Sequence, residues 1–400
     1  MSVYLDHAAA TPLRPEVLDR MLPYLRGTFG NPSSPHVEGR RARLALDEAR
    51  ETVAGVLHAD PREVVFTSGG TESINLAIKG GAWAGKAMGH RILTSAVEHR
   101  AVLDTCASLE KFGFEVVHLP VDRYGRIDPD ALEASLTERT CLVSLQLANN
   151  EVGTVADVTA SIARVRSVGR ALVHVDAVQA AATMAIDVQA LDADMVSVAG
   201  HKLEGPRGVG VLWLRRGTPI LPQIHGGSQE RHRRAGTEDV AAAVGMAEAW
   251  RLADRERDEV VPGLSRRRDR LWGSMRDLGG VELTGHPIDR LPGLLSVLVR
   301  GLQGADLVHA LDLAGLSCST GSACTTGSTE PSHVLTAMGY PAEEARGALR
   351  LSLGRVTTDA EVDTAASILR EVIERQREGV AALTGTGHVA LAVQGAEGAP

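Results

Sequence analysis

The chain has 400 residues, of which 44% are hydrophobic and 23% are charged, and its formal net charge is −8. This length predicts two or three domains, and the hydrophobic content is sufficient for a large core. The negative charge argues against a nucleic-acid-binding protein, no apolar run is long enough for a membrane span, and the first residues lack the pattern of a signal peptide.

The chain contains four cysteines, Cys106, Cys141, Cys318 and Cys324. Four thiols in a chain of this length do not indicate a disulfide framework, and none of them forms a CxxC pair. We therefore expect a reduced, cytoplasmic protein.

Seven short apolar runs rich in β-branched residues lie between residues 63 and 214. They are residues 63–67, 91–95, 115–119, 141–147, 171–175, 194–198 and 209–214. Segments with helical spacing, such as 71–85 and 157–169, lie between most of them. Alternating strands and helices predict an α/β fold with a mostly parallel seven-stranded sheet that is covered by helices.

The pattern changes after residue 214. A loop region at 217–239 precedes a long helical stretch at 239–278. The elements expected beyond it are strands at 281–284, 294–299 and 349–354 and helices near 304–314 and 358–377. They predict a smaller α+β domain. We expect a large domain at 15–258, a small domain made of 1–14 and 259–383, and a poorly ordered tail at 384–400.

Ligands bind open parallel sheets at the carboxyl ends of the strands, so the residues that follow each strand are candidate site residues. The stretch "SGGTES" (68–73) combines two glycines with a helix start, which is typical of a phosphate cradle but also of an ordinary turn. His99, Asn150, Asp176 and Gln179 follow later strands. His174 and Asp176 are two residues apart without a third ligand nearby, so no metal site is expected.

Lys202 directly follows the strand at 194–198, in "AGHKLEGPRGVG" (199–210). Only four of the 42 basic residues are lysines, and arginine cannot replace an amine as a nucleophile. One sheet edge therefore offers a phosphate cradle, a carboxylate, a histidine, amides and an amine. This set of groups is what pyridoxal phosphate requires.

A series of motifs resembles those of the cysteine desulfurases, members of the class V aminotransferase group of fold-type I pyridoxal phosphate enzymes. The motifs are "YLDHAAATP", "GNPSSPH", "FTSGGTES", "VEHRAVLD", "NNEVGT", "HVDAVQ", "AGHKLEGPRGVG", "HGGSQERHRRAGT", "STGSACTTGSTEPSHVL" and "LRLSLGR". The resemblance extends from about residue 3 to residue 378, so it leaves only the tail outside.

The resemblance implies a role for each matching residue. Lys202 would form the Schiff base with pyridoxal 5′-phosphate, Asp176 would pair with the pyridinium nitrogen, and Gln179 would bond the phenolic oxygen. The other implied cofactor contacts are His99, which would stack on the ring and shuttle protons, Asn150 against the ring and the substrate, and Gly70, Thr71 and His201 at the phosphate. Most of the implied cofactor contacts therefore fall on the sheet edge singled out above.

The resemblance has three further implications: for the substrate, for the subunits, and for one position at which this chain differs from its relatives. Arg350 would hold the substrate carboxylate, the bidentate task that suits a guanidinium. Thr237 would reach the cofactor phosphate of the other subunit, so the resemblance implies a homodimer and gives the basic run at 231–234 a place near an interface. Many relatives have a serine where this chain has Ala199, so one hydroxyl contact to the phosphate would be missing.

Cys324 lies among small and hydroxyl residues in "STGSACTTGSTEPS" (319–332), which cannot form a core. The resemblance implies that its thiolate takes sulfur from L-cysteine as a persulfide, releases L-alanine and carries the sulfur to a protein acceptor, as in the housekeeping subgroup with a long loop. Iron–sulfur cluster assembly, tRNA thiolation and DNA phosphorothioation remain open as destinations.

Other readings use the same residues differently. A selenocysteine lyase, or another class V lyase or aminotransferase, would need Lys202 but not this use of Cys324. An assembly scaffold without activity is disfavoured because Lys202, Asp176 and Cys324 are all present. A metal-binding redox protein using Cys318 and Cys324 is disfavoured because their spacing is not usual for a metal site.

Overall fold

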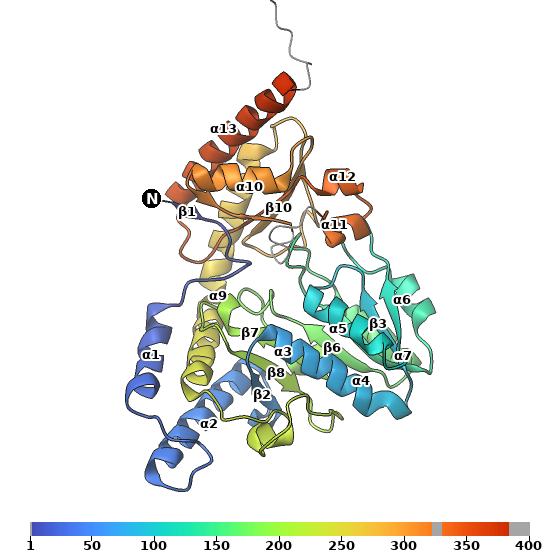
Figure 1. Ribbon diagram of the computed structural model, residues 1–400, viewed down its shortest axis with the longest axis vertical. Coiled ribbons are helices and arrows are strands. Elements are labelled where there is room, and N and C mark those ends of the chain that lie inside the picture. Colours follow the sequence, from blue (N-terminus) through green and yellow to red (C-terminus); the bar gives the residue numbers. More distant parts are fainter. Residues whose placement is uncertain (1, 322–329, 384–400) are drawn as a thin grey trace, which may run out of the picture.

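The computed structural model describes residues 2–321 and 330–383. Cys324 and the predicted tail at 384–400 lie outside these residues. Figure 1 shows a lower lobe built on a large sheet, an upper lobe built on a small one, and the long helix α9 (Val240–Met275) passing from the first to the second.

The large sheet has seven strands in the order β2-β8-β7-β6-β5-β3-β4. They are β2 (Val64–Thr67), β3 (Arg91–Ser95), β4 (Glu115–Leu119), β5 (Thr140–Gln146), β6 (Leu172–Asp176), β7 (Met195–Ala199) and β8 (Gly210–Leu214). β8 runs antiparallel to both of its neighbours, and the other six strands of this sheet point in one direction. The predicted mostly parallel sheet is confirmed, with strand ends that differ by a residue or so from those expected.

Side chains alternate between two hydrophobic cores, one on each face of this sheet. In β6, Val173 and Val175 join one core, whereas Leu172 joins the other. The first core is covered by α1 (Pro15–Arg26), α2 (Val37–Leu57), α6 (Pro129–Ser135), α7 (Val158–Val168), α8 (Val188–Leu191) and the first half of α9. The second is covered by α3 (Gly70–Asn75), α4 (Gly81–Ala84) and α5 (Arg100–Glu110), with a π-helical turn at Leu76–Gly80 joining α3 to α4.

The upper lobe contains a four-stranded antiparallel sheet in the order β12-β13-β10-β9 and a short parallel pair, β1 with β11. The strands are β1 (Val3–Tyr4), β9 (Val281–Leu283), β10 (Leu294–Val299), β11 (Leu316–Ser317), β12 (Ser319–Thr320) and β13 (Ala348–Ser352). The helices are α10 (Gly304–Leu313), α11 (His333–Ala337), α12 (Ala342–Ala345) and α13 (Asp359–Leu383). This arrangement confirms the smaller α+β unit.

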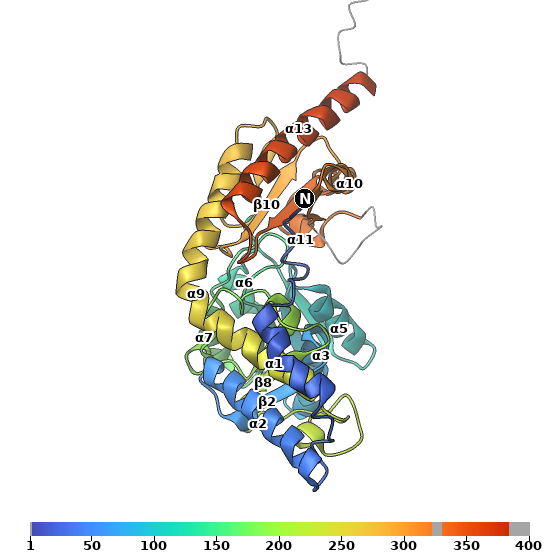
Figure 2. The same cartoon turned by 90° about the vertical axis from the view of Figure 1, so that its left-hand side faces the viewer.

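Helix α9 contributes to the cores of both lobes. Val244 and Trp250 pack into the core of the lower lobe, and Leu264 and Leu271 pack into that of the upper lobe. Figure 2 shows this helix along one side of the molecule. The predicted boundary after residue 258 therefore falls inside a continuous helix, and the division into two domains stays a prediction.

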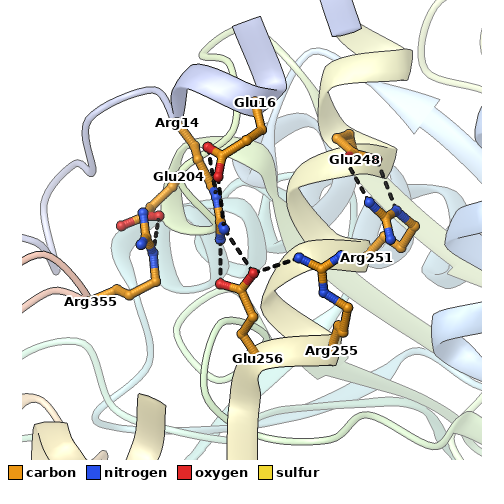
Figure 3. A network of polar contacts seen from close by, with 8 residues as sticks. All are labelled: Arg14, Glu16, Glu204, Glu248, Arg251, Arg255, Glu256 and Arg355. Atoms are coloured by element: carbon orange, nitrogen blue, oxygen red, sulfur yellow. Dashed lines mark hydrogen bonds and ion pairs between the residues drawn. The ribbon is translucent and has the colours of Figure 1, made fainter. Parts of the chain in front are cut away.

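Two sets of ion pairs lie where the lobes meet (Figure 3): one joins the N-terminal segment to α9, and the other joins Arg355, shortly after β13, to Glu204, shortly after β7. Arg14 donates to both oxygens of Glu256 at 2.7 and 2.8 Å and also pairs with Glu16. Arg355 donates to Glu204 at 2.9 Å. We call these ion pairs the junction; together they involve four segments that are far apart in the sequence.

Candidate active site

A cavity of about 620 Å³ lies at the carboxyl edge of the large sheet. Among the residues that line it are Gly70, Thr71, His99, Asn150, Asp176, Gln179, His201, Lys202 and Arg350. The cavity therefore brings together every predicted site residue that the structure describes except Thr237, whose side chain is exposed outside this lining.

The predicted phosphate cradle is the turn between β2 and α3. Gly69 has a φ of 153°, which favours glycine, and a Cβ on Gly210 would come within 2.5 Å of the Gly69 backbone. A Cβ on Gly70 would lie 3.0 Å from Val178. The glycines thus let β8 and Val178 pack closely against the start of α3, and the backbone N–H groups in the first turn of a helix favour an anion.

Lys202 ends a short 3₁₀ turn, Gly200–Lys202, directly after β7. Its Nζ donates to the backbone oxygens of Ala8 and Ala9 at 2.5 and 2.8 Å. Gln179 Nε2 donates to the same oxygen of Ala8 at 2.9 Å. The N-terminal segment therefore closes one side of the cavity, a contribution that the sequence analysis missed because backbone carbonyls carry no residue-type signal.

Asp176 ends β6 with its side chain buried, and its Oδ1 accepts a hydrogen bond from Val178 N at 2.9 Å. Burial raises its pKa to about 6, against the opposing effect of the positive charge of Lys202. His174 is fully buried between Ser144 and Ser197, which bond its two ring nitrogens at 2.9 and 2.8 Å. Both ring nitrogens of His174 are therefore engaged by serine hydroxyls, which gives this histidine a structural role.

His99 caps the N-terminus of α5, where its Nδ1 accepts from Ala101 N at 3.1 Å. Because a backbone amide can only donate, the neutral ring must carry its proton on Nε2. Burial lowers the pKa of His99 to about 4, with help from the charge of Lys202. The cavity therefore contains a neutral imidazole with a defined tautomer.

Arg350 lies on β13 and is only 2% exposed, so its guanidinium is held rather than solvated. Its Nη1 donates to Asn150 O at 2.9 Å, and its Nη2 donates to Asp6 Oδ1 at 3.0 Å. Asp6 had no role in the sequence analysis, since 344 residues separate it from Arg350. The two contacts orient the guanidinium where the upper lobe meets the cavity.

Glu98 is a second buried carboxyl group at this edge, and the sequence analysis missed it. Its Oε1 accepts from Ser95 Oγ at 3.0 Å and from Gln146 N at 2.9 Å, while Oε2 is buried without a hydrogen-bond partner among the described residues. Burial raises its pKa to about 8, and the negative charge of Asp176 adds to the effect. Its place beside His99 in "VEHR" was the available signal.

Comparison with known proteins identifies the family. The family model described as "Aminotransferase class-V" matches residues 3–364. The chain belongs to this family. A curated relative from Methanosarcina thermophila, "Cysteine desulfurase IscS", is 45% identical over 94% of this chain and 93% of its own. The predicted resemblance to cysteine desulfurases is confirmed.

Solved structures agree with this family. A "NifS-like protein" has a TM-score of 0.88 and 38% identity over 94% of this chain and all of its own. A structure titled "SspA in complex with cysteine" has a TM-score of 0.78 and 32% identity over 89% of this chain and all of its own. The family fold predicted from the motifs is confirmed. Within the part of the chain that is described, no helix is long and apolar enough to cross a membrane.

Proposed function

We propose that this chain is a cysteine desulfurase that uses pyridoxal 5′-phosphate, converts L-cysteine to L-alanine and receives the sulfur on Cys324 as a persulfide. The observation that carries the proposal is one cavity that combines an amine, a buried carboxylate, a neutral imidazole and an anchored guanidinium. The relatives named as cysteine desulfurases support it.

The residues of the cavity fit this cofactor. The glycine turn at Gly69 and Gly70 leaves room and backbone donors for a phosphate. Asp176 is a buried carboxylate with a raised pKa, so a cation such as a protonated pyridine nitrogen would relieve an existing cost. Lys202 would hold the cofactor through Nζ. When bound, pyridoxal phosphate supplies an electron sink for the carbon atoms of an amino acid.

The other cavity residues would bind the substrate and move its protons. Arg350 would hold the carboxylate of L-cysteine with a guanidinium that Asn150 and Asp6 already orient. His99 would exchange a proton at Nε2, since its Nδ1 is engaged by the backbone. Lys202 would accept or return a proton at Nζ next to the substrate.

The sulfur transfer needs a thiolate, and the three described cysteines do not offer one. Burial raises the pKa of Cys106 and Cys318 to about 12 and that of Cys141 to about 11. Cys324, which lies outside the described residues, is therefore the proposed nucleophile. Its thiolate would form an S–S bond with the sulfur of L-cysteine as the C–S bond breaks. The electron pair of that bond stays on carbon, which takes a proton to give alanine.

The proposal includes three further features. The chain would act as a homodimer in which Thr237 of one subunit reaches the cofactor of the other, and the exposure of this side chain supports that idea. A cytoplasmic location is supported by the free state of the described cysteines. The persulfide would pass its outer sulfur to a thiolate of an acceptor protein, which restores the Cys324 thiolate.

The test is alanine release from L-cysteine with a reductant present, in the wild type and in Cys324→Ser. We expect release in the wild type and loss of at least ~10³-fold in the variant, because a serine hydroxyl is not ionised at neutral pH. Equal release from both proteins would indicate another class V lyase. Release that is stronger from selenocysteine, and independent of Cys324, would indicate a selenocysteine lyase.

A further inference from the structure

The first residues of the chain contact two groups of the proposed site that belong to different lobes. Asp6 Oδ1 accepts from Arg350 Nη2 at 3.0 Å, and the backbone oxygen of Ala8 accepts from Lys202 Nζ at 2.5 Å. Arg350 lies on β13 in the upper lobe, whereas Lys202 follows β7 in the lower lobe. One short segment therefore touches both the proposed substrate clamp and the proposed cofactor amine.

The backbone on both sides of Asp6 is fixed to the strand that carries Arg350. Leu5 O accepts from Ser352 N at 2.7 Å, and Ser352 O accepts from His7 N at 3.2 Å. Ser352 lies on β13 shortly after Arg350, and Asp6 forms a parallel bridge with it. The carboxylate is therefore held beside the guanidinium by backbone hydrogen bonds to the same strand.

The ion pair between Asp6 and Arg350 balances a buried charge. The Arg350 side chain is 2% exposed, and the Asp6 side chain is 18% exposed. Among the described residues, Asp6 is the one carboxylate that pairs with this guanidinium, and the acceptor at Asn150 O is uncharged. A buried cation without a counter-ion is costly. Asp6 therefore offsets this cost when no carboxylate ligand is bound.

Asp6 and a ligand would approach Arg350 from different sides. Among the described residues, the lining of the cavity at the sheet edge includes Arg350 but not Asp6. Each Nη atom of a guanidinium carries two N–H groups. Asn150 O engages Nη1 and Asp6 engages Nη2, so both Nη atoms keep a donor for an amino-acid carboxylate. Once this carboxylate binds, it shares one positive charge with Asp6, and the two negative groups repel each other.

We propose that Asp6 is a positioning residue that acts as the internal counter-ion of Arg350, and that it limits the affinity of the site for amino-acid carboxylates. This inference rests on the proposed function, but it concerns the release of L-alanine rather than cofactor binding or sulfur transfer. When L-alanine leaves, Asp6 again balances the buried guanidinium, which stabilises the site without a ligand. The clamp can then orient the substrate well and still release the product.

The first experiment compares Asp6→Asn with the wild type, each with its cofactor. The amide keeps an acceptor for Arg350 Nη2 but removes the negative charge. We expect KM for L-cysteine and the inhibition constant of L-alanine to fall together by ~3–10-fold, because the repulsion is removed. The value of kcat should not rise, because the carboxylate is held equally in the ground state and the transition state. Isothermal titration with L-alanine would measure the tighter binding without turnover.

A second variant and a distant control separate charge from orientation. Asp6→Ala removes the charge and also the acceptor for Nη2, so Arg350 loses one of its fixed contacts and KM should be higher than in Asp6→Asn. The matched control is Asp277→Asn, which breaks an exposed pair with Arg370 at 2.9 Å and should change neither KM nor the inhibition constant. A rise of KM in Asp6→Asn would mean that Asp6 only orients Arg350, and the inference would be wrong.

A further measurement tests the ion pair without substrate. Denaturant unfolding of the cofactor-free proteins compares Asp6→Asn, Arg350→Gln and the double variant with the wild type. We expect Asp6→Asn to lower the unfolding midpoint in the wild type and much less in the Arg350→Gln background, where the buried cation is absent. Glu374→Gln, at an exposed glutamate on α13, should leave the midpoint unchanged. Equal shifts in the two backgrounds would contradict the role of Asp6 as a counter-ion.

These measurements distinguish a failure of the inference from a failure of the proposed function. Absence of alanine release from the wild type would refute the proposed function, and the unfolding midpoints would still show whether Asp6 compensates the charge of Arg350. Release of alanine together with equal inhibition by L-alanine in the wild type and in Asp6→Asn would overturn this inference alone.

Discussion

Two regions of the molecule hold carboxyl groups in different ways. At the carboxyl edge of the large sheet, Asp176 and Glu98 are buried and accept hydrogen bonds from uncharged donors. At the junction, Glu256 and Glu204 accept hydrogen bonds from arginines. The pKa values follow this difference. Burial raises that of Asp176 to about 6 and that of Glu98 to about 8, while the bonds from Arg14 lower that of Glu256 to about 2.

The difference in hydrogen-bond partners distinguishes the sheet edge, which is suited to bind a ligand, from the junction, which stabilises the fold. At the junction each charge has its partner within the chain, so the network can hold the segments in place without help (Figure 3). At the sheet edge, among the described residues, neither carboxyl group has an arginine partner of this kind, and burial raises the pKa of both; buried carboxyl groups with raised pKa values are common in active sites. A bound cation would supply the missing partner at the sheet edge. It would add nothing at the junction.

The largest effect that would test this comparison is expected for Asp176→Asn. The amide keeps an acceptor for Val178 N but removes the negative charge, so we expect alanine release to fall at least ~10²-fold and cofactor affinity to weaken. Activity and equilibrium dialysis against pyridoxal phosphate would measure both. Asp306→Asn, an exposed carboxylate on α10, is the matched control. Full activity in Asp176→Asn would show that the raised pKa of Asp176 has no functional meaning.

An intermediate effect is expected for Glu98→Gln, and it depends on pH. The folded-state pKa of Glu98 is raised from 4.5 to about 8, so the folded protein binds its proton more tightly than the unfolded chain. The contribution of Glu98 to stability is therefore fully present below about pH 4.5 and is lost as the pH rises through about 8. Asp176 also loses its contribution to stability as the pH rises, between about pH 4 and pH 6, and it does so in the wild type and in Glu98→Gln alike.

Denaturant unfolding of the cofactor-free proteins at pH 5, 7 and 9 would measure this effect. Relative to the wild type, Glu98→Gln should become more stable at each step up in pH, because the amide has no proton to lose. Glu374→Gln should follow the wild type throughout. Parallel pH profiles for Glu98→Gln and the wild type would mean that Glu98 is not a titrating buried group.

The fold and much of the site could be predicted because their signals are local. Buried parallel strands appear as short β-branched runs, and the residues that follow them, such as Lys202 and Asp176, are then placed at one edge by the topology of the sheet. The resemblance to a family added Arg350, which follows no strand of the large sheet. These predictions needed no knowledge of three-dimensional contacts.

The missed contributions of Asp6, Ala8 and Ala9 come from contacts that no local pattern records. Lys202 bonds the carbonyls of Ala8 and Ala9, 194 and 193 residues away, and Arg350 bonds Asp6. The motif "LDHAAATP" was noticed, but a backbone acceptor leaves no mark on residue type. Glu98 was overlooked because burial, which gives it its properties, depends on the packing of three strand ends.

The smallest effect is expected at the junction, for Glu256→Gln. Arg14 is only 7% exposed and would keep Glu16 as a partner, so we expect a loss of about 1–2 kcal/mol in unfolding free energy. Thermal unfolding at pH 7 would record this as a shift of a few degrees. The difference from the wild type should disappear as the pH falls from about 4.5 through about 2, where Glu256 itself becomes protonated.

Glu248→Gln, which breaks the more exposed pair with Arg251 on the same helix, should cost less, about 0.3–0.5 kcal/mol. In both variants kcat and KM should match the wild type. A loss of activity in Glu256→Gln comparable to that in Asp176→Asn would mean that the junction takes part in the reaction, and the distinction between the two regions would fail.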